Sequence, residues 1–180
     1  MRKEIGQSPD EVFDVVDEHD SVIGSCPRSE IHRRQLRHRA IHIFWLRADG
    51  QLCLQRRSYA KDNCPGQVST SCAGHVDSGE TYHVAAVREL REEIGLQVRP
   101  EDLLEIDYAP CHADLGHEFV RSYLLRGDYA PTLGRAEVDS ILWRQPAEVD
   151  AWMRRSPAGF SLPLVHLYGR PDVRRALGLA

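Results

Sequence analysis

The chain has 180 residues, of which 42% are hydrophobic and 28% are charged, and its formal net charge is −4. This length and composition are typical of one globular domain with a sizeable core, so we expect a single domain over residues 1–180. The weak negative charge argues against nucleic acid or an anionic membrane as a partner. The sequence contains no run of about 18 apolar residues, so it predicts no transmembrane helix.

Cysteine usage indicates a reducing compartment. The five cysteines are scattered along the chain and form no Cys-x-x-Cys pair, so their spacing does not predict a structural zinc site. The N-terminal residues lack the apolar core of a signal peptide. We therefore expect reduced thiols and a cytoplasmic location.

Short runs of strand-forming residues alternate with turn residues and with helical patterns. The expected strands cover residues 12–16, 22–24, 40–46, 51–56, 67–72, 103–109, 119–125 and 140–144, and the first two form an N-terminal hairpin over 12–24. A short helix is expected over 30–36, a longer one before Gly95, and three within the C-terminal region 147–179, over 147–153, 160–168 and 172–177. Strands with helices before, between and after them predict an α/β/α sandwich with a mixed central sheet.

The ends of two helices are marked by capping residues. Ser29 is a candidate cap for the first helix, and Asp77 or Ser78 can cap the longer one. Glu80 follows Asp77 by three residues in a capping-box relation, and Gly95 can end this helix.

The longer helix carries an unusual concentration of negative charge. Glu89, Glu92 and Glu93 have the spacing i, i+3 and i+4, which places them on one face. Carboxylates this close repel one another, and a hard divalent cation such as Mg²⁺ relieves the repulsion. The alternative is a solvated face on which Arg88 and Arg91 form salt bridges within the helix.

Residues 74–96 resemble the Nudix box of the Nudix hydrolase superfamily. That motif is a Gly, five residues, a Glu, seven residues, Arg-Glu, an aliphatic residue, one residue, Glu-Glu, one residue, Gly and an aliphatic residue. Every specified position is filled, by Gly74, Glu80, Arg88, Glu89, Leu90, Glu92, Glu93, Gly95 and Leu96. The resemblance implies the same α/β/α fold, with Mg²⁺ or Mn²⁺ assisting the attack of water on a diphosphate.

The resemblance also implies roles for individual residues. Glu89, Glu92 and Glu93 are expected to hold the metal together with the carbonyl of Gly74. Glu89, Glu93 or Glu118 is expected to take the proton of the attacking water.

Two further pairs of residues are candidates for supporting roles. Glu80 and Arg88 are expected to form a salt bridge that holds the loop against the helix. Arg57 and Lys61 are four residues apart and are candidate clamps for the diphosphate, because Arg gives bidentate hydrogen bonds and Lys a compact charge. Their spacing alone fits two ordinary surface cations equally well.

Beyond the box, the chain resembles the branch of the superfamily related to type I isopentenyl diphosphate isomerases. This resemblance implies a candidate second metal site at His32, His38 and His75, with Glu118 as a fourth ligand. An isomerase-like reaction is therefore an alternative to hydrolysis.

One departure from the isomerases weakens this alternative. They carry a catalytic cysteine in a Cys-Gly-His triplet, whereas this chain has Ala73-Gly74-His75. Cys72 lies one residue earlier, and one step along a strand turns a side chain to the opposite face. The intact box and the missing thiol favour hydrolysis.

The substrate is expected to be small and to contain a diphosphate, as a nucleoside diphosphate does. Aromatic side chains that can stack a base are Trp45, Tyr59, Phe119 and Tyr123. A third interpretation is a nucleotide-binding module without turnover, and the complete set of carboxylates argues against it. A homodimer is common in the family and is a candidate assembly.

Overall fold

The computed structural model describes residues 10–61 and 63–179, so the outer limits of the predicted domain lie outside the described residues. The strands are β1 (Val12–Val16), β2 (Val22–Pro27), β3 (His38–Leu46), β4 (Leu52–Arg57), β5 (Val68–Ser69), β6 (Cys72–His75), β7 (Leu103–His112), β8 (Glu118–Arg126) and β9 (Val138–Arg144). The α-helices are α1 (Arg28–Arg34), α2 (Tyr82–Ile94), α3 (Pro146–Arg155), α4 (Leu162–Tyr168) and α5 (Pro171–Ala176). Short 3-10 helices are η1 (Pro100–Asp102), η2 (Ala113–Leu115) and η3 (Pro157–Gly159).

A mixed sheet of seven strands occupies the middle of the molecule. Its main strand order is β5-β4-β3-β8-β7, with β6 paired to β3 and β9 paired to β4. β3 and β8 run parallel, and the other strand pairs are antiparallel. The parallel register places His38 directly beside Glu118, where both strands begin.

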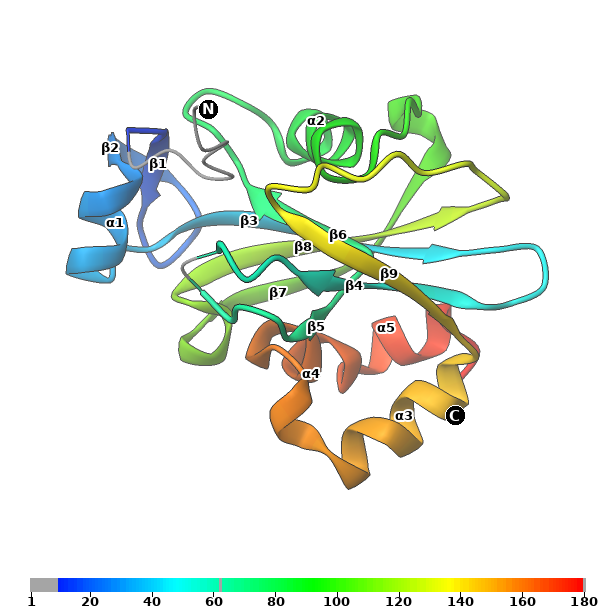
Figure 1. Cartoon of the computed structure of the whole chain (residues 1–180). Helices are drawn as coiled ribbons and strands as arrows, with labels where there is room; N and C mark the ends of the chain where they lie inside the picture. The colour runs from blue at the N-terminus through cyan, green and yellow to red at the C-terminus, as the bar shows by residue number, and fades with distance from the viewer. Residues whose placement is uncertain (1–9, 62, 180) are drawn as a thin grey trace.

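Helices cover both faces of this sheet, with α2 on one face and α3, α4 and α5 on the other (Figure 1). The side chains of β3 alternate between these faces, as the period of two requires. Ile41 and Ile43 join the core beneath α2, and Ala40 and Phe44 join the core on the other side. The predicted α/β/α sandwich with a mixed sheet is confirmed. None of the helices in the described residues combines the length and the apolar character that a membrane crossing requires.

The β1–β2 hairpin forms a separate two-stranded sheet beside α1 (Figure 1). It anchors the loop that leads into α2, because the carboxylate of Asp14 accepts hydrogen bonds from the Ser78 hydroxyl at 2.6 Å and from the Gly79 N–H at 3.2 Å. Phe13 also forms a β-bridge with Asp77 in this loop. The hairpin therefore fixes the loop against the body of the fold.

Two predicted helix caps are wrong. Ser29 lies inside α1, which begins at Arg28 after Pro27. α2 is capped by Thr81, whose hydroxyl oxygen accepts the N–H of Val84 at 3.3 Å. The predicted ending of α2 at Gly95 is confirmed, with Gly95 at a φ of 68°.

The single strand predicted over 67–72 is also wrong, because this segment forms two short strands. β3 and β4 pair only near their hairpin turn, at Leu46 and Leu52, and then separate. The segment pairs first with β4 as β5 and then crosses to β3 as β6. This crossing brings β6 to the N-terminal part of β3, where the histidines lie.

Candidate active site

α2 does not present its carboxylates as a solvated face. Glu89 is 8% exposed and Glu93 is fully buried, while the side chain of Glu92 is 44% exposed. The apolar residues Ala86 and Leu90 pack this helix onto the sheet. Two acidic groups therefore lie in the interior, where a carboxylate requires a partner.

Glu93 is neutralised by a buried lysine. Lys61 Nζ lies 2.9 Å from Glu93 Oε1 and 2.8 Å from Glu137 Oε2. The other oxygen of Glu93 accepts hydrogen bonds from Gln55 Nε2 at 3.0 Å and from the Ala73 N–H at 3.2 Å. Burial alone would raise the pKa of Glu93, but Lys61 and these hydrogen bonds hold it below its usual value.

Glu89 has a different electrostatic environment. Burial and the neighbouring Glu93 raise the pKa of Glu89 well above its usual value, and Arg88, at 2.7 Å, offsets this only in part. The carboxylate lies directly over Gly74, because a Cβ at position 74 would come within 2.0 Å of Glu89 Cδ. A glycine is therefore required for the backbone and this carboxylate to approach each other.

Arg88 links the loop to the helix, as the Nudix resemblance implies. Its guanidinium donates to Glu80 at 2.9 Å and to the carbonyl of His75 at 2.9 Å. It also reaches Glu89 and, at 3.3 Å, Glu92. One cation thus positions three of the acidic side chains of the box.

A small cavity of about 140 Å³ lies between α2 and β6, and Gly74, Glu89, Glu92 and Glu137 are among the residues that line it. Glu93, which is paired with Lys61, is not among the residues that line it. Carboxylates and a backbone carbonyl are the ligands that hard divalent cations prefer. The raised pKa of buried Glu89 also fits such an ion, because a cation would remove the cost of its negative charge.

A second group of ligand atoms is formed by three histidines. His32 comes from α1, His38 from β3 and His75 from β6, and one ring nitrogen of each lies within 4.8 Å of the others. Glu118 faces this group from β8, 3.2 Å from His75 Nε2 and 3.4 Å from His38 Nε2. Burial and the adjacent His75 and His38 rings lower the pKa of His32 to about 4. The candidate second metal residues therefore meet in space.

His38 and Glu118 require a cation between them. His38 Nδ1 lies 2.9 Å from the carbonyl of Leu36, which can only accept, so Nδ1 carries the hydrogen. In the neutral ring the lone pair is then on Nε2, which is buried without a hydrogen-bond partner and faces the carboxylate of Glu118. Two acceptors face each other, and a proton or a metal ion would relieve their repulsion.

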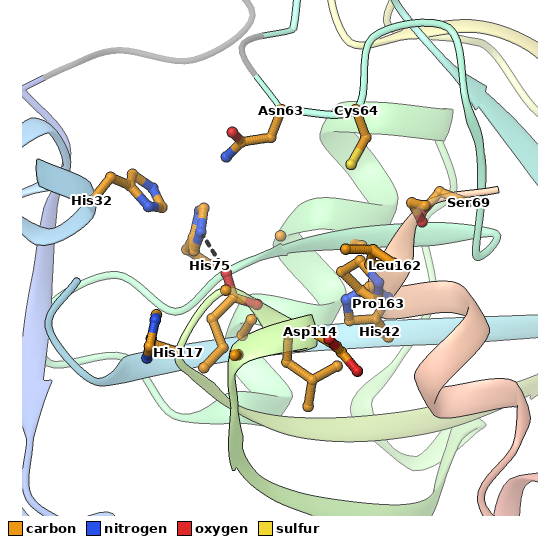
Figure 2. A pocket seen from close by; sticks show the side chains of 18 of the residues that line it. His32, His42, Asn63, Cys64, Ser69, His75, Asp114, His117, Leu162 and Pro163 are labelled. Atoms are coloured by element: carbon orange, nitrogen blue, oxygen red, sulfur yellow. Dashed lines mark hydrogen bonds and ion pairs between the residues drawn. The ribbon is translucent and has the colours of Figure 1, made fainter. Parts of the chain in front are cut away.

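A larger cavity of about 480 Å³ adjoins this histidine group (Figure 2). Figure 2 shows His32 and His75 on one side and Leu162 on the other. Arg57 lines the cavity, and its Nε donates to the carbonyl of Asn63 at 3.0 Å. Lys61, the other predicted clamp, is only 5% exposed and is engaged by Glu93 and Glu137. The two cations therefore do not converge on one surface.

β6 separates the two cavities, and Ala73, Gly74 and His75 line both of them. Cys72 is fully buried in the core beneath α2, whereas Ala73 pairs with His42 and borders the cavities. Burial raises the pKa of the Cys72 thiol well above its usual value. Cys72 therefore does not replace the thiol missing at position 73.

Three residues of this region escaped the sequence analysis. Glu137 and Gln55 bind the buried Lys61–Glu93 pair from distant segments. His42 lines the larger cavity, as does Ala40. The two residues are two apart on one strand and therefore share a face of the sheet, and this spacing is the signal that could have found His42. Of the aromatic candidates for base stacking, Trp45 and Tyr123 are fully buried.

Comparison with known proteins identifies the family. The family profile described as NUDIX domain matches residues 36–162, more than half of the chain. The chain belongs to the Nudix hydrolase family. Members of this family generally use divalent metal ions and act on small phosphate-containing substrates.

Two curated relatives have different names. An uncharacterized Nudix hydrolase of Nostoc sp. is 34% identical, over 81% of this chain and 86% of that protein. An isopentenyl-diphosphate Delta-isomerase of Serratia proteamaculans is 33% identical, over 85% of this chain and 87% of that protein. Among solved structures, a Deinococcus radiodurans protein superposes with a TM-score of 0.72 at 28% identity, over 89% of this chain and 100% of that one.

Proposed function

We propose that this Nudix protein is a metal-dependent hydrolase that cleaves a diphosphate linkage in a small substrate, such as a nucleoside diphosphate. The observation that carries the proposal is the acidic cavity between α2 and β6, where Glu89 and Glu92 meet the Gly74 backbone. This set fits Mg²⁺ or Mn²⁺. A divalent cation bound there would supply charge neutralisation for the diphosphate and a water of lowered pKa.

The protein residues have separate roles in this proposal. Glu89 and Glu92 would hold the metal, and Glu93, which is paired with Lys61, is the third expected carboxylate ligand. Glu89 is also the candidate proton acceptor, because burial and the neighbouring Glu93 raise the pKa of its carboxylate well above the usual value, beside the Gly74 backbone. Arg57 binds the phosphates from the larger cavity.

Arg88 and Glu80 position the carboxylates through their salt bridge at 2.9 Å. Substrate enters through the larger cavity, which shares the wall formed by Ala73, Gly74 and His75 with the acidic one. A homodimer remains a candidate assembly.

The test is a release assay with Mg²⁺ or Mn²⁺ across nucleoside phosphates, nucleotide sugars, ADP-ribose and isopentenyl diphosphate. We expect metal-dependent release of phosphate or nucleoside monophosphate from at least one substrate. Glu92→Gln should lose most of this turnover, by about 100-fold or more, because it removes one metal ligand. Since the Glu92 side chain is largely exposed, the variant should remain folded, and wild-type turnover in it would refute the assignment.

Isopentenyl diphosphate isomerisation is the second candidate. The histidine group supports it, because His38 Nε2 and Glu118 face each other in a way that a metal ion would satisfy. Ala73 opposes it, since the matching residue of the isomerases is a catalytic cysteine. Conversion of isopentenyl to dimethylallyl diphosphate in the same panel, without hydrolysis of any substrate, would favour this second candidate.

A further inference from the structure

One end of the larger cavity is polar and has no role in the proposed hydrolysis. His42 on β3, Ser69 on β5 and Ser161 before α4 line this end. Figure 2 shows His42 and Ser69 close to Pro163, across the cavity from His32. These three polar side chains are almost completely buried.

His42 is held in one tautomer. Its Nδ1 lies 2.8 Å from Thr70 Oγ1, and the Thr70 hydroxyl donates its own hydrogen to the carbonyl of Cys72 at 3.2 Å. Thr70 Oγ1 therefore accepts from His42, so the ring hydrogen is on Nδ1 and the lone pair is on Nε2. Burial lowers the pKa of His42 to about 4, which keeps the ring neutral at neutral pH.

The Nε2 atom of His42 is available to a ligand. It forms no hydrogen bond to another residue within 10–61 and 63–179, and the ring lines the cavity. In this tautomer it can only accept a hydrogen, so it selects an O–H or N–H group. A ligand without such a group would leave this buried acceptor without a hydrogen-bond partner, and the free energy of binding would be less favourable.

The neighbouring serines supply the complementary group. Ser161 Oγ accepts the Leu164 N–H at 3.4 Å as the cap of α4, and it is hydrogen-bonded to Ser69 Oγ at 3.3 Å. Whichever of the two hydroxyl groups donates to the other, one hydroxyl hydrogen of the Ser69–Ser161 pair remains for a ligand. The wall thus offers one acceptor and one donor, and neighbouring hydroxyl groups of a ligand can satisfy both.

The lining of the cavity also favours hydroxyl groups over a base at its polar end. Of the described residues that line it, none is Phe, Tyr or Trp, so it lacks the usual stacking surfaces. Arg57 provides a cation for phosphate in the same cavity. We propose that this polar end binds the hydroxylated group of a sugar or polyol diphosphate, with His42 Nε2 accepting a hydrogen bond from a substrate hydroxyl. The inference rests on the proposed function for the placement of the diphosphate.

A binding experiment with two probes tests this subsite. The probes are the methylenediphosphonate esters of ribose, linked through its C5 hydroxyl, and of pentan-1-ol, which resist hydrolysis and differ in their hydroxyl groups and ring. Calorimetry with Mg²⁺ should show that the wild type binds the ribose probe about tenfold more tightly, as one or two hydrogen bonds allow. His42→Phe should remove the part of this preference that comes from its Nε2 and leave the affinity for the pentyl probe unchanged.

Two further variants separate recognition from folding. Thr70→Val leaves His42 in place but removes the acceptor that keeps the ring hydrogen on Nδ1. It should therefore reduce the preference for the ribose probe only in part. This variant provides the test if His42→Phe does not fold. His19→Phe, at an exposed position outside the cavity, is the matched control and should bind as the wild type does. Equal affinities in the wild type, an undiminished preference in His42→Phe, or no binding of the ribose probe would overturn the proposal.

Turnover of hydrolysable ribose 5-diphosphate, measured separately, distinguishes the proposed hydrolysis from the proposed hydroxyl-binding subsite. Binding preference without turnover of this ester or of any substrate in the panel above would refute the proposed hydrolysis and leave the subsite standing. Turnover without binding preference would refute the subsite and leave the hydrolysis standing.

Discussion

Lys61→Met should make the stability of this protein depend on a divalent cation. Lys61 is the cation that neutralises Glu93, at 2.9 Å in the interior, and Met keeps the length of the side chain without the charge. Removing one partner of a buried ion pair costs about 3–5 kcal/mol. Because Gln55 and the Ala73 N–H still bind the carboxylate of Glu93, we expect a loss near the lower end, about 3 kcal/mol.

The measurement is urea denaturation at neutral pH, with EDTA and with saturating Mg²⁺. In EDTA, Lys61→Met should unfold about 3 kcal/mol more easily than the wild type. Mg²⁺ should restore most of this difference, because an ion bound only by the folded state stabilises it, by about 2.7 kcal/mol at 100 times its Kd. The wild type, in which Lys61 already neutralises Glu93, should gain less from Mg²⁺.

Glu137→Gln is the control for this experiment. It removes the partner of Lys61 whose side chain is 21% exposed, so its effect should be smaller, about 1 kcal/mol. If Lys61→Met were as stable as the wild type in EDTA, or gained no more from Mg²⁺, Lys61 would not be the neutralising group.

Three other results are expected. Gly74→Ala should lower both turnover and metal affinity, because the new Cβ would overlap the Glu89 carboxylate. Titration with Mn²⁺, followed by electron paramagnetic resonance, would measure the metal affinity, and an unchanged affinity would contradict this prediction. Arg57→Gln should raise KM about tenfold with little change in kcat, as measured by steady-state kinetics, since it removes ground-state binding of phosphate. Stability should fall on acidification from about pH 6.5 to 4, because the pKa of His42 is about 4 when folded and about 6.5 when unfolded, so the unfolded chain binds the proton more strongly. His42 contributes about 3 kcal/mol to this loss at about 1.36 kcal/mol per pKa unit, and His42→Phe should flatten that part of the profile in denaturation experiments at pH 7 and pH 4.

The local pattern of the sequence was sufficient for most strands of the sheet and for the helix of the Nudix box, but not for the division of residues 67–75 between β5 and β6. Alternation in β3 and the spacing of the apolar residues in α2 report which faces are buried, and these faces decide the architecture. The cap of α2 was missed because Ser78 has the right chemistry for a cap but is bound by Asp14, 64 residues away. Local propensity cannot include such a partner.

The site was predictable only where one segment carries it. The residues of the box are close in sequence, so their spacing already placed the carboxylates on one face. Lys61 appeared to be a surface clamp because its partner Glu93 lies 32 residues away. The histidine group was reached through resemblance, since its members come from α1, β3 and β6, which only the folded topology brings together.

The position of β6 between the two cavities bears on how reactions can diverge within this fold. Four residues form this strand, and its Ala73-Gly74-His75 part borders both the acidic cavity and the histidine-lined one. A substitution at position 73 therefore alters the chemistry available to a bound diphosphate without moving a helix or rebuilding a loop. A relative named as a Nudix hydrolase and one named as an isomerase each match more than four-fifths of this chain, so proteins of both names share this scaffold.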